Sequence, residues 1–269
     1  YQEAHQLFVE LGLEWDAAWT VHNMGILAEQ RDMLDEARQC YEEAYPVFVR
    51  EGDVVMMVKT QFNLAQLCAR QAQYGQALHH LDEARAHLAT MTDSADGGYV
   101  DLYEARVRQE LGETAEAERL LQRALADFEG LERHVEAAEV LVELSQQPAA
   151  DAAAIADSLN YLEQAADHLR HVDVPLFEGW VQLERAEKML VLGRVEEARQ
   201  LANRLYDLFA ARQLPIRQGQ ALAIQGDCAQ RGAPHTARYC YQQALDLIGQ
   251  SAPLLAARCW HGLGEVAVI

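Results

Sequence analysis

The sequence predicts an all-α fold made of stacked, antiparallel helical hairpins. The main observation is a small residue that recurs about every 40 positions, at Gly25, Ala65, Ala105, Ser145, Ala186, Gly226 and Gly264. A second series runs in step with it, at Ala37, Ala77, Ala117, Ser158, Ala198 and Ala237. Because a small side chain lets two helices approach closely where they cross, two such series at one period indicate an array of similar helical pairs.

One repeat can be followed from Trp15 to Gly52. Each half places small and apolar residues three or four positions apart, as on one face of a helix, at Ala18, Val21, Met24, Gly25 and Ala28 and then at Ala37, Tyr41, Ala44 and Phe48. The segment between the halves, 30–33, is short, so the two helices must be antiparallel. Pro46 lies inside the second pattern, where we expect a kink or a lost hydrogen bond.

The unit recurs over residues 63–84, 104–124, 184–205 and 226–244, and its first part recurs at 260–267. Most second halves carry a small, then a large, then a small residue. In the set Ala198, Ala202 and Leu205 the second residue is small and the third is large, so we expect local repacking there.

The fourth unit is the least regular, because residues 146–158 are rich in alanine and contain Pro148. We expect a lengthened turn at 147–153 and a helix that resumes near Ala154.

This succession of small and large positions over two helices resembles the tetratricopeptide repeat, and the resemblance covers nearly the whole chain. It implies a right-handed α-solenoid with about six full repeats and a partial one at each end, at residues 1–14 and 252–269. The long period is similar to that of the sensor region of MalT-type regulators. We expect residues 1–269 to form one superhelical domain. Neither end carries a polar capping element and the chain does not open with Met, so we expect more protein on both sides.

The chain is strongly acidic, with 22 Lys and Arg against 42 Asp and Glu and a formal charge of −20. That balance argues against nucleic acid or an anionic membrane as a direct partner. The five cysteines are odd in number and form no Cys-x-x-Cys pair, so we expect buried, reduced thiols and a cytoplasmic location. No long apolar run and no signal-peptide pattern occurs.

Motifs for catalysis or cofactor binding are absent from the sequence, including the Walker loop and the His-Glu-x-x-His pattern. His79, Glu83 and His87 are spaced four apart on one predicted helix. Ligands spread over two turns rarely close on one ion, and we judge His168 and His171 in the same way. We therefore expect no catalytic residue, no cofactor and no metal.

The resemblance also implies where a partner binds. In such arrays the first helices of the hairpins line the concave face, and the residues just before the small position point into it. Transferred by register, the candidate partner-binding residues are Trp19, His22, Asn23, Lys59, Asn63, Arg70, Tyr99, Tyr103, Arg106, Glu143, Trp180 and Glu184, with Phe62, Glu139 and Glu187 beside them.

Two of these residues, Asn23 and Asn63, hold the same place in successive repeats. A side-chain amide is both a donor and an acceptor, so it can clamp the backbone of an extended peptide. The alternative is that each Asn bonds a neighbouring helix. The aromatic residues of the set are either anchors for a bound segment or packing residues between hairpins.

Charge divides this candidate groove. Lys59, Arg70 and Arg106 lie in its first half, and the later half carries acidic residues at Glu139, Glu143, Glu184 and Glu187. A peptide with an acidic part toward the second and third repeats and a basic part toward the fourth and fifth would be complementary.

The function that we expect is that of a non-catalytic scaffold or sensor, which binds a protein or peptide within a larger bacterial protein. It would regulate or recruit for an adjoining effector domain, and the closing stretch 254–269 looks similar to arrays that precede CHAT protease domains. One alternative is the sugar-sensing region of a MalT-like transcriptional regulator. Another is a stand-alone or self-associating adaptor.

Overall fold

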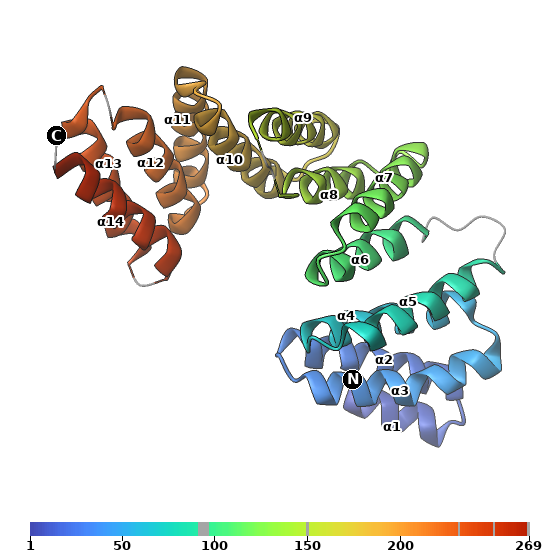
Figure 1. Ribbon diagram of the computed structural model, residues 1–269. Helices are drawn as coiled ribbons and strands as arrows, with labels where there is room; N and C mark the ends of the chain where they lie inside the picture. The colour runs from blue at the N-terminus through green and yellow to red at the C-terminus, as the bar shows by residue number, and fades with distance from the viewer. Residues whose placement is uncertain (91–96, 149–150, 231, 250, 268–269) are drawn as a thin grey trace. The chain divides into compact units, whose positions relative to one another are not determined.

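The computed structural model describes residues 1–90, 97–148, 151–230, 232–249 and 251–267. These residues contain fourteen α-helices and no β-strand (Figure 1). The all-α prediction is therefore confirmed. The helices divide into two compact units, Tyr1–Leu131 and Glu132–Ile269.

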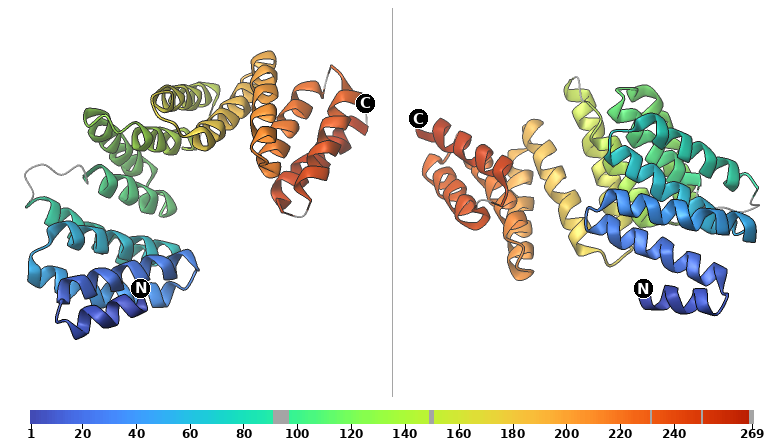
Figure 2. Two further views of the ribbon diagram at one scale, coloured as in Figure 1. Left: turned by 180° about the vertical axis from the view of Figure 1, so that it is seen from behind. Right: turned by 90° about the horizontal axis from the view of Figure 1, so that it is seen from below.

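The first unit contains one helix followed by three hairpins, α2/α3, α4/α5 and α6/α7 (Figure 2). Each helix packs mainly against its neighbours in sequence. The helices are α1 (Gln2–Glu10), α2 (Glu14–Gln30), α3 (Leu34–Glu51), α4 (Val54–Arg70), α5 (Tyr74–Leu88), α6 (Gly97–Glu110) and α7 (Thr114–Gly130).

The second unit contains three hairpins, α8/α9, α10/α11 and α12/α13, followed by a single helix. Its helices are α8 (His134–Ser145), α9 (Ala152–Leu169), α10 (Pro175–Val191), α11 (Val195–Ala211), α12 (Pro215–Ala229), α13 (Pro234–Ile248) and α14 (Pro253–Ala267). Proline occupies the first turn of α10, α12 and α13, where its missing N–H costs no helical hydrogen bond.

The two series of small residues are buried between the helices of the hairpins. All six members of the second series are at most 4% exposed. In the first series the six positions from Gly25 to Gly226 are buried as well. The prediction is wrong at the last position. Gly264 is exposed, and Gly262 is the glycine that is buried against Tyr241. Spacing identified the helix here, but not the residue in contact.

Within a hairpin, the size of the small residue matches the large residue that it contacts. A Cβ atom added to Gly25 would lie 2.7 Å from Cε1 of Tyr41, and one added to Gly226 would lie 2.6 Å from Cε1 of Tyr241. Where the large residue is Leu81, the small residue is alanine, and Ala65 and Leu81 share one core cluster. The tyrosine hairpins therefore require glycine, and the leucine hairpin has room for a methyl group.

The hairpin α2/α3 has the boundaries that its sequence predicts, because α2 ends at Gln30 and α3 begins at Leu34. α3 continues through Pro46, which has no N–H to donate to the helix. It ends where Gly52 adopts a left-handed conformation with φ of 69°, which a residue without a Cβ atom tolerates best.

The start of α9 differs from the prediction. The helix begins at Ala152, before the expected position near Ala154. The reason is Asp151, whose side chain accepts a hydrogen bond of 2.9 Å from the N–H of Ala154 and so caps the first turn. Residues 149–150 of the expected turn lie outside the described part of the chain.

Replacing Asp151 by alanine is expected to lower the free energy of unfolding by about 1 kcal/mol, because the first turn of α9 loses its side-chain cap. Thermal denaturation followed by circular dichroism measures the change. Asp157→Ala is the matched control, because Asp157 is exposed on the same helix and caps nothing. An equal loss in both variants would show that charge, not capping, is responsible.

The five cysteines are all unpaired thiols. Cys68, Cys240 and Cys259 are buried, and Cys40 and Cys228 are half-buried. Burial raises the pKa of the Cys228 and Cys259 thiols to about 11, which leaves them weak nucleophiles. Among the described helices, none is both long enough and apolar enough to cross a membrane.

Candidate functional site

Four side chains that the sequence assigns to the groove line one hollow in the first unit. The hollow has a volume of about 190 Å³ and is lined by Val58, Lys59, Phe62 and Asn63 of α4 and by Tyr99 of α6. α4 and α6 are the first helices of consecutive hairpins, and they contact one another. The hollow therefore lies between two first helices, where the resemblance placed partner binding.

The helical period brings the α4 residues together. Lys59, Phe62 and Asn63 are spaced by three and four positions, so they share one face of the helix. The opposite face is in the core, where Leu64 and Cys68 are at most 3% exposed. Burial of that face fixes the direction in which the three side chains point.

Aromatic rings form the apolar wall of the hollow. The ring centroid of Phe62 lies 4.3 Å from that of Tyr103 and 6.2 Å from that of Tyr99, both edge to face. Tyr99 in turn packs edge to face against Phe128 of α7, at 5.1 Å. The guanidinium of Arg106 lies over the Tyr103 ring, 4.9 Å from its centroid. Tyr99, Tyr103 and Arg106 are thus held in a single packed group with Phe62.

His22 is not a surface residue, contrary to the sequence expectation that it faces a partner. Its side chain is 3% exposed and packs against Tyr41 and Phe48. Burial, and then the positive charge of Lys59, lower its pKa to about 4. The imidazole is therefore neutral at pH 7.

The neutral imidazole determines how Asn63 is oriented. Thr60 donates its hydroxyl to the carbonyl of Met56 at 2.7 Å, so its oxygen accepts from Nδ1–H of His22 at 3.1 Å. Nε2 of His22 then has a lone pair, which accepts a hydrogen bond of 3.4 Å from the Asn63 amide. His22 thus acts as a positioning residue.

The Asn63 amide also lies near Tyr41. The Tyr41 hydroxyl donates to Glu29 at 3.2 Å; burial and Glu29 raise the pKa of Tyr41, and the Asn63 amide lowers it. The amide group of Asn63 therefore faces the preceding repeat. Within the described residues its carbonyl Oδ1 accepts no hydrogen bond, so the side chain presents an acceptor at the hollow.

Lys59 supplies a positive charge at the rim of the hollow. Its side chain is exposed, and it forms no ion pair with any described residue. Only one other lysine, Lys188, occurs in the chain. An exposed cation beside aromatic rings and an amide acceptor can bind a carboxylate next to an apolar group.

The remaining predicted residues of the first unit do not join this hollow. Trp19 is 41% exposed on α2, and its carbonyl accepts a hydrogen bond of 2.8 Å from the amide of Asn23. Asn23 thus bonds its own helix. Arg70 pairs with Asp32 at 2.6 Å and with Glu29 at 3.4 Å, so its charge is balanced within the repeat.

In the second unit the predicted residues Glu143, Trp180 and Glu184 are half-buried on α8 and α10. The ring of Trp180 stacks on Phe177 with centroids 5.7 Å apart. Burial, followed by the charge of Glu187, raises the pKa of Glu184.

The sequence did not reveal the role of Arg258 in this unit. The guanidinium of Arg258, on α14, pairs with Glu187 of α10 and with Asp227 of α12, at 2.6 Å from the latter. The charge of Glu187 is therefore balanced within the chain and is not available to pair with a partner. Three separate helices are joined by this one arginine.

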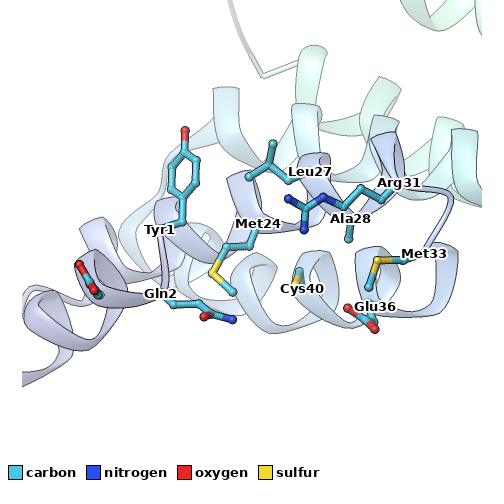
Figure 3. Close-up of a pocket in the computed structure, with 10 residues that line it drawn as sticks. Tyr1, Gln2, Met24, Leu27, Ala28, Arg31, Met33, Glu36 and Cys40 are labelled. Atoms are coloured by element: carbon cyan, nitrogen blue, oxygen red, sulfur yellow. The ribbon is translucent and has the colours of Figure 1, made fainter.

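A second hollow in the first unit contains none of the predicted site residues. It has a volume of about 440 Å³ and lies between the start of α1 and the helices α2 and α3, where Tyr1, Met24, Leu27 and Cys40 line it (Figure 3). Arg31 and Glu36 also line it (Figure 3).

Comparison with known proteins agrees with this architecture. Residues 16–89 match the family model described as tetratricopeptide repeat. Residues 16–89 therefore contain tetratricopeptide repeats. No curated protein sequence matches it significantly.

Solved structures with the same fold include other repeat proteins. The chain is similar to a Signal Transduction ATPase with Numerous Domains (STAND) protein from Pyrococcus horikoshii, which carries a tetratricopeptide repeat sensor. The TM-score is 0.76 and the identity 14%, over 98% of this chain and 40% of that one. It therefore spans less than half of the STAND protein. It is also similar to a putative kinesin light chain with TPR-like repeats from Podosopora anserina, with a TM-score of 0.55 and 19% identity over 72% of this chain and 95% of that one. A third similar structure is Rap protein complexed with Competence and Sporulation Factor, with a TM-score of 0.63 and 13% identity over 94% of this chain and 74% of that one.

Proposed function

We propose that this tetratricopeptide repeat chain is a non-catalytic scaffold that binds an extended peptide segment of a partner protein at the hollow between α4 and α6. The observation that carries this proposal is the convergence of Lys59, Phe62, Asn63 and Tyr99 on one hollow. Tetratricopeptide repeats are typically protein-interaction modules, and the similar Rap protein was solved in complex with Competence and Sporulation Factor.

Each side chain has a separate part in binding. The hollow of about 190 Å³ admits one aliphatic or aromatic side chain against Phe62 and Tyr99. The free carbonyl of Asn63 accepts a backbone N–H of the segment, which is a contact that does not depend on its sequence. Lys59 pairs with an acidic side chain beside the apolar one. The favoured segment therefore has an acidic residue next to Leu, Ile or Phe.

Synthetic arrays of short, end-capped peptides test this preference. In one array an acidic residue is placed next to Leu, Ile or Phe, and in the matched array Asp becomes Asn and Glu becomes Gln. We expect fluorescence anisotropy to show saturable binding in the first array and weaker binding in the second. Equal binding to both arrays would contradict the role given to Lys59.

Lys59→Glu is expected to weaken binding of the best acidic peptide by about tenfold or more, because attraction at the rim becomes repulsion. The same change at Arg212 is the matched control, since Arg212 is exposed and lies in the second unit, outside the hollow. Anisotropy titrations of both variants at one salt concentration give the two affinities. Unchanged affinity of Lys59→Glu, or an equal loss in Arg212→Glu, would exclude this site.

The similarity to the STAND protein favours a second candidate function, that of a sensor region attached to an effector domain. That protein carries a tetratricopeptide repeat sensor, and the similarity covers 98% of this chain. Sequencing the native gene beyond both ends distinguishes the forms of this candidate. An adjoining helix-turn-helix domain would support a MalT-like, sugar-sensing regulator. An adjoining α/β domain with a Cys and a His would support a CHAT-like protease. Stop and start codons at the present ends would leave a free-standing adaptor in the cytoplasm.

A further inference from the structure

A polar hollow in the second unit is lined by arginines, although the chain as a whole is strongly acidic. It has a volume of about 460 Å³ and lies among the end of α9, one face of α10 and one face of α11, which follow one another along the chain (Figure 1). The side chains relevant here are Arg170, Glu178, Gln182, Arg185, Gln200 and Arg204. None of them belongs to the peptide site proposed above.

Arg185 carries a donor without an acceptor. Its Nη1 donates to Gln182 at 2.6 Å, and its Nη2 lies 3.4 Å from a carboxylate oxygen of Glu163. Its Nε is buried and donates to no acceptor among the described residues. A buried N–H without a partner is rare and costs free energy, so an acceptor that reached this N–H would stabilise the fold.

Arg204 is a second guanidinium with unused donors. It is exposed at the hollow and forms no hydrogen bond or ion pair with the described residues. Arg170 lies at the edge, where it pairs with Asp167 at 2.8 Å and both side chains are largely exposed. Such an exposed pair is weak and exchanges easily for a stronger anion.

The lining of the hollow contains three arginines and two carboxylates, Glu178 and Glu197. Glu197 is bound through both of its oxygens to Arg194, which does not line the hollow. Glu178 is the other carboxylate, so arginines outnumber carboxylates in the lining. A guanidinium edge matches the geometry of two oxygens of a phosphate, so two or three arginines around one hollow favour a dianion.

We propose that this hollow binds a small organic phosphate monoester. The phosphate lies between Arg185 and Arg204, and turning the Arg185 guanidinium toward it supplies the acceptor that Nε lacks. The volume exceeds what a phosphate group occupies and falls in the range of small-molecule sites. Hydroxyl groups on the organic part of the ester then form hydrogen bonds with Gln182, Gln200 and Glu178.

Isothermal titration calorimetry with glucose 6-phosphate, inorganic phosphate and glucose tests this site on the whole chain. We expect saturable binding of glucose 6-phosphate, weaker binding of inorganic phosphate that competes with it, and no binding of glucose. Absence of saturable binding by either phosphate would overturn the proposal. Inorganic phosphate that binds as tightly as the ester would overturn the assignment of an organic ligand.

Arg204→Gln is expected to weaken glucose 6-phosphate binding by about tenfold, because a charge-assisted hydrogen bond is lost. Arg204 is exposed, so this change leaves the core intact. Arg199→Gln is the matched control, since Arg199 lies on the same helix, pairs with Glu196 at 2.7 Å and does not line the hollow. An equal loss in both variants would show that only the general charge of α11 is being measured, and would refute the site.

Discussion

Replacing Tyr241 by alanine is expected to lower the free energy of unfolding by about 4 kcal/mol. The Tyr241 side chain is fully buried, and its ring lies between two glycines, Gly226 of α12 and Gly262 of α14. Neither glycine has a side chain that could move into the space left by the ring. The cavity therefore remains open, which is the condition under which an aromatic truncation costs most.

Urea denaturation of matched variants measures this effect. Tyr239→Ala is the control, because Tyr239 is on the same helix but 64% exposed, and its loss should change stability by less than about 0.5 kcal/mol. Tyr241→Phe removes only the hydroxyl that donates to Asp227 at 2.6 Å, and should cost about 1–2 kcal/mol. If Tyr241→Ala and Tyr241→Phe were equally destabilised, the hydrogen bond and not the packing would dominate.

The buried, neutral His22 is expected to make the fold less stable as the pH falls from about 6.5 to about 4. The pKa of His22 is lowered to about 4 in the folded chain, whereas an unfolded histidine titrates near 6.5. Between these values the unfolded state binds more protons, so stability decreases as pH falls. The full difference corresponds to about 3 kcal/mol.

A difference experiment isolates this contribution from the titration of the carboxylates. The free energy of unfolding is measured against pH for the native chain and for His22→Gln, which cannot take up the proton. We expect the native chain to lose more stability than the variant as the pH is lowered. His79→Gln, at a histidine whose side chain is 69% exposed, is the control for the loss of a histidine at the surface. Parallel profiles for the native chain and His22→Gln would mean that His22 is not neutral in the fold.

The period of the small residues was sufficient to predict the helices and their pairing, because each hairpin needs close approach at the same two positions. It could not identify the last contact, since Gly262 and Gly264 are both small and only packing against Tyr241 distinguishes them. The start of α9 was recognisable in principle. Asp151 followed by three alanines is an N-cap signal, although Pro148 and the alanines before Asp151 are also typical of a turn.

The residues that α4 contributes to the candidate site could be predicted from the sequence, but most contacts between helices could not. Lys59, Phe62 and Asn63 share a face by spacing alone, and the period of the repeats relates them to Tyr99. By contrast, the burial of His22 and its bond to Asn63 depend on how two repeats pack, which spacing does not determine. The same holds for the pair of Glu187 and Arg258, whose partners are 71 residues apart.

The match between glycine and tyrosine inside a hairpin affects how such a gene can be recombined. Gly25 faces Tyr41, and Gly226 faces Tyr241, whereas the hairpin α4/α5 combines Ala65 with Leu81. A duplication or deletion whose crossover falls between hairpins keeps each pair together. A crossover inside a hairpin would place a tyrosine ring against an alanine methyl group, or leave a leucine beside a glycine with a gap. The unit that can be copied in evolution, or moved in an engineered array, is therefore the whole hairpin and not the single helix.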